Sequence, residues 1–152
     1  MDSTVVIEPA YNALSDVRAL FEAAFQIYLD IQHYADELRA PAAKYAPPDG
    51  RLYLARVDGR AAGCIALRRL DGERCEMKRL YVQPQYRGRG LARQLIRRIT
   101  EDARQIGYRC MLLDPLPVLE DAVRLYRQLG FYEIPCYNDS PVESTLFFQL
   151  DL

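Results

Sequence analysis

The spacing of hydrophobic residues changes several times along this chain, and each change predicts a new secondary-structure element. A short β-branched run over residues 4–7 predicts a strand that ends before Pro9. The apolar residues that follow recur every three or four positions, which predicts a helix over residues 15–29 with one buried face. A shorter helix over residues 33–40 and a proline-rich loop over residues 41–50 complete this part of the chain.

Three apolar runs in the middle of the chain predict an antiparallel meander. The first two runs, residues 52–57 and 61–67, flank an Asp-Gly-Arg turn at residues 58–60, and Asp-Gly between apolar runs is a strong signal of a β-hairpin. A second turn at residues 71–73 leads into the third run, residues 75–82. Each of these strands should therefore pair with the next one along the chain.

The second half of the chain alternates between helices and strands. Apolar residues spaced by four predict a helix over residues 91–106, and a strand over residues 110–113 follows it. A further helix stops at Gly130, and strands are expected over residues 131–134 and 145–150.

The order of these elements predicts the fold class. It combines an antiparallel meander with a strand-helix-strand crossover, so we expect an α/β fold of the α+β kind. Its central sheet should be mixed and mostly antiparallel, with helices on both faces. Half of the 152 residues are apolar, which suffices for one core, and residues 1–152 are expected to form a single domain.

The charge balance argues against two classes of partner. The formal net charge is -1, so no overall positive field favours a nucleic acid or an anionic membrane. The amino terminus lacks a basic region followed by a long apolar run, and no stretch approaches the ~20 apolar residues of a membrane helix. We therefore expect a cytoplasmic protein with no nucleic-acid or membrane partner.

The cysteines suggest no metal site. Cys64, Cys75, Cys110 and Cys136 are widely separated, and His33 is the only imidazole in the chain. Because each cysteine lies in an apolar run, we expect buried thiols in a reducing compartment. A disulfide between Cys64 and Cys75 across a hairpin is the alternative.

The segment LYVQPQYRGRGLA, residues 80–92, carries the clearest chemical signal. It reads as the end of a strand, a glycine-containing loop and the start of a helix. Gly88 and Gly90 let the backbone approach a ligand closely, and the N–H groups of the first helical turn can bind an anion, so a diphosphate site is predicted. An ordinary turn is the alternative. The P-loop and dinucleotide motifs do not fit, because no Lys-Ser or Lys-Thr follows and Arg93 replaces the third glycine.

Two motifs in this chain resemble those of the GNAT acetyltransferases. The pattern V-x-P-x-Y-R-G-x-G-x-A over residues 82–92 is similar to the family's central motif, in which the loop holds the diphosphate of acetyl-CoA. The pattern A-x-x-L-Y-x-x-x-G-F over residues 122–131 is similar to its second signature. The resemblance implies a GNAT-like fold. It also implies an N-acetyltransferase that moves an acetyl group from acetyl-CoA to a primary amine of a small molecule or peptide, by direct transfer in a ternary complex.

The same resemblance assigns residues to the cosubstrate acetyl-CoA. The strand end would bind the pantetheine arm through its backbone, and the loop and helix start would surround the diphosphate. The residues implied are Leu80, Tyr81, Val82, Arg87, Gly88, Arg89, Gly90, Leu91, Ala92 and Arg93. One local departure is Leu119, where many relatives have an asparagine.

Tyr126 is the candidate catalytic acid. In the family, a tyrosine at this place protonates the departing thiolate of CoA. A phenol with a pKa of ~10 can donate to a thiolate whose conjugate acid has a pKa of ~8.5 when the two groups are within hydrogen-bond reach. The alternative is a tyrosine that only packs at the end of a helix.

Glu76 is the candidate base. Attack on the thioester needs a neutral amine, and an alkyl amine with a pKa of ~10 is mostly protonated at neutral pH. Glu76 lies six residues before Val82, so strict alternation would place both side chains on the same face of the strand. Several family members have a glutamate in this region. A solvent-facing strand residue and a water chain to bulk solvent are the alternatives.

The acceptor is expected to be selected by the first helices and the loop over residues 28–53. Tyr28, His33 and Glu37 are the candidate substrate-binding residues, because a carboxylate and aromatic rings attract a cation. Tyr45 and Tyr137 are further candidates for an amine pocket, and ordinary surface or core positions are the alternative for each. Other functions that remain open are a non-catalytic acyl-CoA sensor or interaction module and a transferase of longer acyl groups. A homodimer is compatible with the family.

Overall fold

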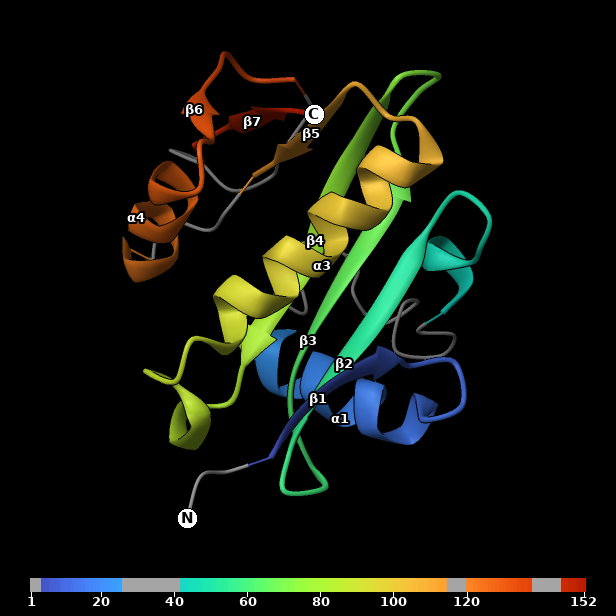
Figure 1. Cartoon of the computed structure of the whole chain (residues 1–152), viewed down its shortest axis with the longest axis vertical. Helices are drawn as coiled ribbons and strands as arrows, with labels where there is room; N and C mark the ends of the chain where they lie inside the picture. Colours follow the sequence, from blue (N-terminus) through green and yellow to red (C-terminus); the bar gives the residue numbers. More distant parts are fainter. Residues whose placement is uncertain (1–3, 26–41, 115–119, 138–145) are drawn as a thin grey trace.

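The computed structural model describes residues 4–25, 42–114, 120–137 and 146–152, which contain one mixed sheet (Figure 1). Seven strands follow the order β1-β2-β3-β4-β5-β7-β6 across the sheet. Neighbouring strands are antiparallel except β4 and β5, which are parallel, so the predicted mixed and mostly antiparallel sheet is confirmed. The strands are β1 (Val5–Pro9), β2 (Arg51–Val57), β3 (Arg60–Arg69), β4 (Arg74–Val82), β5 (Cys110–Leu113), β6 (Tyr132–Glu133) and β7 (Phe148–Asp151).

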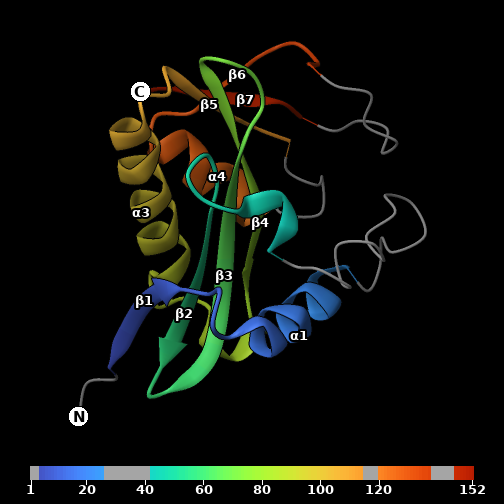
Figure 2. The same ribbon diagram turned by 90° about the vertical axis from the view of Figure 1, so that its right-hand side faces the viewer.

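Helices cover both faces of this sheet, as predicted. Figure 2 shows α1 (Leu14–Phe25) and α3 (Leu91–Ile106) on opposite sides of it. The third described helix is α4 (Glu120–Gln128). Two short 3-10 helices, η1 (Ala43–Tyr45) and η2 (Pro84–Tyr86), lie where the sequence predicted loops.

The element boundaries agree with the sequence in most places. The predicted helix over 91–106 and the predicted strand over 110–113 are confirmed to the residue. The expected end of the first strand is wrong, because β1 continues through Pro9, which lies opposite Tyr53. Because β1 is an edge strand, one of its sides has no neighbouring strand, and a proline can be accommodated there without the loss of a hydrogen bond in the sheet. The expected helix over 33–40 lies outside the described residues.

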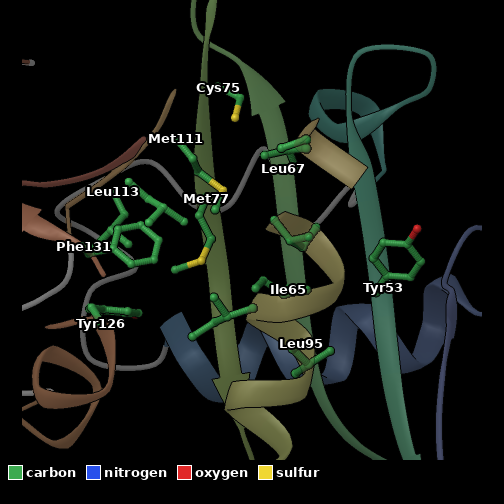
Figure 3. Packing of buried hydrophobic residues seen from close by; sticks show 14 of the residues in the cluster. Tyr53, Ile65, Leu67, Cys75, Met77, Leu95, Met111, Leu113, Tyr126 and Phe131 are labelled. Atoms are coloured by element: carbon green, nitrogen blue, oxygen red, sulfur yellow. The ribbon is translucent and has the colours of Figure 1, made fainter. Parts of the chain in front are cut away.

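Two separate cores lie against the two faces of the sheet. The larger core packs beneath α3 and α4, and Figure 3 shows part of it, including Ile65, Leu95 and Phe131. The smaller core packs beneath α1 around Phe21. Side chains of β2 alternate between the two cores, so that Leu52 belongs to the α1 core and Tyr53 to the core beneath α3. Because β2 is covered on both faces, the middle of this strand is buried throughout.

A β-bulge interrupts β4 near its carboxyl end. Cys64 of β3 lies opposite Tyr81, whereas Ala66 lies opposite Lys78, so two steps along β3 match three steps along β4. Arg79 lies in the bulge and has a φ of 59°, in the left-handed region. The extra residue reverses the alternation of side chains along the rest of the strand.

The bulge corrects the expectation that Glu76 and Val82 share a face. Cys75, Met77 and Val82 all belong to the core beneath α3. Because Glu76 lies between Cys75 and Met77, it projects from the opposite face of the sheet. The prediction was wrong because it assumed unbroken alternation over residues 76–82.

The disulfide alternative is also wrong. Cys64 packs in the α1 core and Cys75 in the α3 core, so the two thiols lie on opposite faces of the sheet. None of the four cysteines forms a disulfide. Cys64 and Cys75 are buried as predicted, Cys110 is half-buried, and Cys136 is exposed, contrary to the expectation.

These environments predict different thiol reactivities. Burial raises the pKa of Cys64 to about 12 and also raises the pKa of Cys75, so both thiols stay protonated and unreactive. Brief alkylation of the native protein at about pH 8 should label Cys136 first and leave Cys64 and Cys75 unmodified until the chain unfolds. Mass spectrometry of tryptic peptides measures the order, and labelling of Cys64 at the rate of Cys136 would contradict it.

Gly63 is required by the close approach of β3 and β4. A Cβ atom built on Gly63 would lie 2.6 Å from the carbonyl oxygen of Tyr81. Because that contact is with backbone, Gly63→Ala should lower the free energy of unfolding by about 1–3 kcal/mol. The matched control is Gly72→Ala, since a Cβ there would meet no atom within 4 Å, and it should change stability by less than ~0.5 kcal/mol. Equal urea midpoints for the two variants would contradict the prediction.

Candidate active site

The parallel strands β4 and β5 separate part of the way along their length. They pair only where residues 74–76 lie opposite residues 110–112, although β4 continues to Val82. Beyond Glu76, the edge of β4 that faces β5 therefore has no partner strand among the described residues. We call this place the β4–β5 opening.

The backbone of β4 presents hydrogen-bonding groups to this opening. The N–H of Gln83 donates to the carbonyl of Ala62 on β3 at 2.8 Å. Since consecutive N–H groups of a strand point to opposite sides, those of Val82 and Leu80 point toward the open edge. The carbonyl of Val82 accepts a hydrogen bond from Nε of Arg87 at 2.9 Å, which orders the start of the glycine loop.

The glycine loop continues directly from this strand to α3. Gly88 and Gly90 both have a φ of 79°, a conformation that favours glycine over other residues. Gly90 is the N-cap of α3, and no side chain caps the helix there. The N–H groups of the first turn and the helix dipole thus remain for an anion, and residues 87–90 are exposed.

Arginine side chains surround this loop in different ways. The guanidinium of Arg89 lies over the ring of Tyr86, 5.5 Å from its centroid, and that of Arg87 lies 5.8 Å from the ring centroid of Tyr81. Arg93 instead donates to Oε1 of Gln128 at 2.8 Å, and so links α3 to α4. The structure therefore brings together the residues expected to hold the cosubstrate, from the end of β4 to the start of α3.

Tyr126 of α4 lies on the same side of the sheet as α3. Its side chain is only 3% exposed, and its ring packs 5.7 Å from Phe131 and 6.3 Å from Phe148 between centroids. Figure 3 shows the ring near Phe131. Its hydroxyl donates to no described residue. Desolvation, with a smaller contribution from the charge of Asp114, raises the pKa of Tyr126, so the phenol keeps its proton.

A cluster of four charged side chains and one tyrosine lies on the opposite face. It consists of Arg68, Glu76, Lys78, Asp114 and Tyr137, and we call it the β4 ion cluster. Nε of Arg68 lies 2.7 Å from Oε1 of Glu76, and Nζ of Lys78 lies 3.6 Å from the same oxygen. Lys78 also pairs with Asp114 at 3.2 Å, across the β4–β5 opening. The hydroxyl of Tyr137 donates to Oε2 of Glu76 at 2.6 Å.

Glu76 is an ionised carboxylate within this cluster. Its side chain is 1% exposed, and desolvation opposes its charge. The nearby charge of Lys78, the hydrogen bond from Tyr137, and Arg68 together outweigh desolvation, so that the pKa of Glu76 lies below its ordinary value. Glu76 is therefore not the solvent-facing strand residue that the sequence left as an alternative.

The acceptor-binding residues expected from the sequence are only partly described. Tyr28, His33 and Glu37 lie outside the described residues. Tyr45 is fully buried in the α1 core, so its ring does not line an open pocket as suggested. Tyr137 does reach the site, through Glu76.

Sequence reasoning missed three members of the ion cluster. Lys78 follows Glu76 by two residues, and this spacing alone indicates a shared face. Arg68 lies directly opposite Glu76, a pairing that depends on the register of the hairpin. Asp114 follows the last residue of β5, and its place beside Lys78 depends on where the two strands separate.

Among the described residues, no group of three or more His, Cys, Asp and Glu side chains is arranged to hold a metal ion. No helix in those residues has both the length and the apolar character needed to cross a bilayer.

Comparisons of the sequence with known proteins cover most of this site. Residues 14–131 match the profile of the acetyltransferase (GNAT) family. An uncharacterised N-acetyltransferase of Schizosaccharomyces pombe is 38% identical over 144 residues, covering 91% of this chain and 88% of that protein. The N-acetylaspartate synthetase of Danio rerio is 32% identical over 132 residues, covering 81% of this chain and 46% of that protein.

Solved structures show the same fold. An acetyltransferase from Streptococcus agalactiae superposes with a TM-score of 0.82 at 23% identity, covering 97% of this chain and 98% of that one. A structure of a Salmonella typhimurium acetyltransferase with its cofactor acetyl-CoA has a TM-score of 0.73 at 18% identity, covering 97% of this chain and 93% of that one.

Proposed function

Since the chain belongs to the acetyltransferase (GNAT) family, we propose that it moves the acetyl group of acetyl-CoA to the primary amine of a small molecule or peptide. Transfer is direct, within a ternary complex of protein, acetyl-CoA and amine. The observation that carries this proposal is the arrangement of side chains around the β4–β5 opening. Tyr126, the proposed proton donor, is buried on one side of the sheet, and the β4 ion cluster lies on the other.

Acetyl-CoA would lie along the free edge of β4. The N–H groups of Leu80 and Val82 are placed to bond the pantetheine arm as a neighbouring strand would. The diphosphate would rest on the loop over residues 87–90 and on the uncapped first turn of α3, where backbone N–H groups and the helix dipole favour negative charge. In this position the thioester comes to the bulge at Arg79.

The chemistry then needs one polarising donor and one acid. The amine nitrogen attacks the acetyl carbon, and a backbone N–H of the open β4 edge stabilises the negative charge that develops on the carbonyl oxygen. The carbon–sulfur bond breaks, and the departing thiolate takes the proton of the Tyr126 hydroxyl. The raised pKa keeps the phenol protonated at neutral pH but also makes it a weaker acid, so the transfer depends on close approach of the Tyr126 hydroxyl to the thiolate.

The amine must also lose a proton, and Glu76 is the proposed acceptor. Its carboxylate lies on the face of the sheet opposite Tyr126, so an amine that approaches from that face meets the thioester from the side away from the acid. Both oxygens of Glu76 already have partners. A water molecule would therefore carry the proton between the amine and this carboxylate.

One relative favours a small acceptor over a peptide. The name N-acetylaspartate synthetase describes a protein whose product is an acetylated small molecule. This chain covers less than half of that relative, so the likeness bears on the class of acceptor and not on its identity.

The test begins with binding of the cosubstrate. Calorimetric titration with acetyl-CoA should give a Kd on the order of micromolar. A panel of amines, amino acids and peptides is then assayed for CoA release. Amine-dependent release supports the transferase, and binding without release from any amine supports a sensor. Faster release from longer acyl-CoA donors would support a different acyltransferase, and absence of binding would overturn the cosubstrate site.

A further inference from the structure

We propose that the acetyl acceptor carries a carboxylate close to its amine, and that Arg68 and Lys78 recognise that carboxylate. The acceptor class is thus a free amino acid, a zwitterion. This inference rests on the proposed function, because it assumes that the amine meets the thioester at the β4–β5 opening.

The first support is that both cations have hydrogen-bond donors that no described residue uses. Arg68 bonds Glu76 through Nε alone, and its two terminal nitrogens donate to no described residue. A guanidinium binds a carboxylate best through two parallel N–H groups. Lys78 has three donors, and among the described residues its ion-pair partners are Asp114 and Glu76. The side chains of Arg68 and Lys78 are 36% and 19% exposed, so a ligand can reach both.

The second support is the balance of charge in the β4 ion cluster. Arg68 and Lys78 contribute two positive charges, and Glu76 and Asp114 contribute two negative charges. A site for a polyamine would be expected to have an excess of carboxylates, because every charge on that ligand is positive. A zwitterion fits an alternating set, with its ammonium group toward the carboxylates and its carboxylate toward the cations.

The third support is the position of the cations relative to the reacting bond. Lys78 immediately precedes the bulge at Arg79 and bridges the opening to Asp114. Arg68 lies opposite Glu76, and Glu76 is two residues from Lys78 along β4, or about 7 Å at ~3.3 Å per residue. Arg68 and Lys78 are therefore diagonal neighbours on the same face of the sheet. A carboxylate held between them is thus a few bonds from an amine at the opening, as in an amino acid.

The experiment compares each amino acid with its carboxamide. The twenty L-amino acids and their carboxamides are supplied with acetyl-CoA, and CoA release gives kcat and KM for each pair. The preferred amino acid should be used about 10- to 100-fold better, by kcat/KM, than its carboxamide, because the amide cannot form a charged pair. Use of a carboxamide or a peptide as efficiently as the amino acid would overturn the inference and leave the proposed function standing.

Variants test which cations are responsible. Arg68→Gln and Lys78→Gln should lower the ratio of kcat/KM between the amino acid and its carboxamide by about 10- to 100-fold. The ratio is the readout because both cations also contact Glu76, and any effect on that carboxylate is shared by the two substrates. Lys78→Arg should restore part of the preference. The matched control is Arg69→Gln, since Arg69 is the next residue on β3 and lies on the other face, paired with Asp49 and over the ring of Tyr108. An equal loss in Arg69→Gln would overturn the assignment.

A binding measurement separates this inference from the proposed function. Amino acid added to the CoA complex should raise the thermal midpoint of the wild type and of Arg69→Gln, and not that of Arg68→Gln. Unchanged acetyl-CoA affinity in Arg68→Gln shows that the variant is folded. A wild-type protein that binds acetyl-CoA but releases CoA with no amine, with or without a carboxylate, would instead overturn the proposed function.

Discussion

Replacing Tyr126 with phenylalanine is expected to lower kcat by about 10²- to 10³-fold and to leave stability unchanged. The two effects separate because the ring and the hydroxyl have different partners. The ring packs against Phe131 and Phe148 and would be kept, whereas the hydroxyl bonds no described residue. Steady-state CoA release measures kcat, and urea unfolding measures stability.

Two controls test whether the loss of kcat comes from the missing hydroxyl of Tyr126. Calorimetry should show the same acetyl-CoA affinity in Tyr126→Phe, because the ground state loses no contact. Tyr132→Phe removes an exposed hydroxyl that donates to Asp151. Because Tyr132 is on β6, at the edge of the sheet and separated from β4 by two strands, this variant should leave kcat unchanged. If Tyr126→Phe kept its full kcat, the thiolate would leave with a proton from water, and the acid assigned here would be wrong.

Replacing Glu76 with glutamine is expected to lower kcat by about 10²-fold and to destabilise the protein in a pH-dependent way. Glutamine keeps an acceptor for Tyr137 but removes the charge that pairs with Arg68 and Lys78. Leaving these cations without their buried partner should cost about 1–3 kcal/mol at neutral pH.

The direction of the pH effect follows from the pKa of Glu76. Because this pKa is lower in the folded protein than its ordinary value of 4.5, the carboxylate stabilises the fold fully above that value. The advantage of the wild type over Glu76→Gln should disappear as the pH falls through the folded pKa. Urea unfolding of both proteins from about pH 8 to about pH 3 measures it. A difference that persists at the acid end would show that the effect of glutamine is steric.

An exposed ion pair provides the control for Glu76. Glu133 lies 3.6 Å from Arg127, and both side chains are 53% exposed. Because exposed pairs contribute little, Glu133→Gln should change stability by less than ~0.5 kcal/mol at any of these pH values. Its kcat should match that of the wild type.

The fold could be predicted from the sequence where local signals are strong. The Asp-Gly turn predicted the hairpin of β2 and β3, and apolar residues spaced by four up to Gly107 predicted α3. The glycine loop could be read as an anion site because its function depends on backbone N–H groups, which glycine positions reveal. In each of these cases the cause lies within a few consecutive residues.

The candidate site could not be predicted where it depends on register. A bulge adds one residue at Arg79, and no turn residue or proline marks it in the sequence. Glu76 was therefore predicted to lie on the same face of the sheet as Val82, whereas it lies on the opposite face. The pairing of Arg68 with Glu76 needs the exact alignment of two strands, and that of Lys78 with Asp114 needs the point at which β4 and β5 separate. Such contacts join residues distant in sequence, and periodicity carries no information about them.

The two outer strands of the sheet bear on how copies of this protein associate. At one edge β1 ends in Pro9, and at the other edge β6 has only two residues. A proline and a very short strand both make poor templates for a further strand, so the sheet resists edge-to-edge aggregation. A dimer that continues one sheet into the next through either of these described edge strands is therefore disfavoured, and self-association should use side chains on a face of the molecule instead.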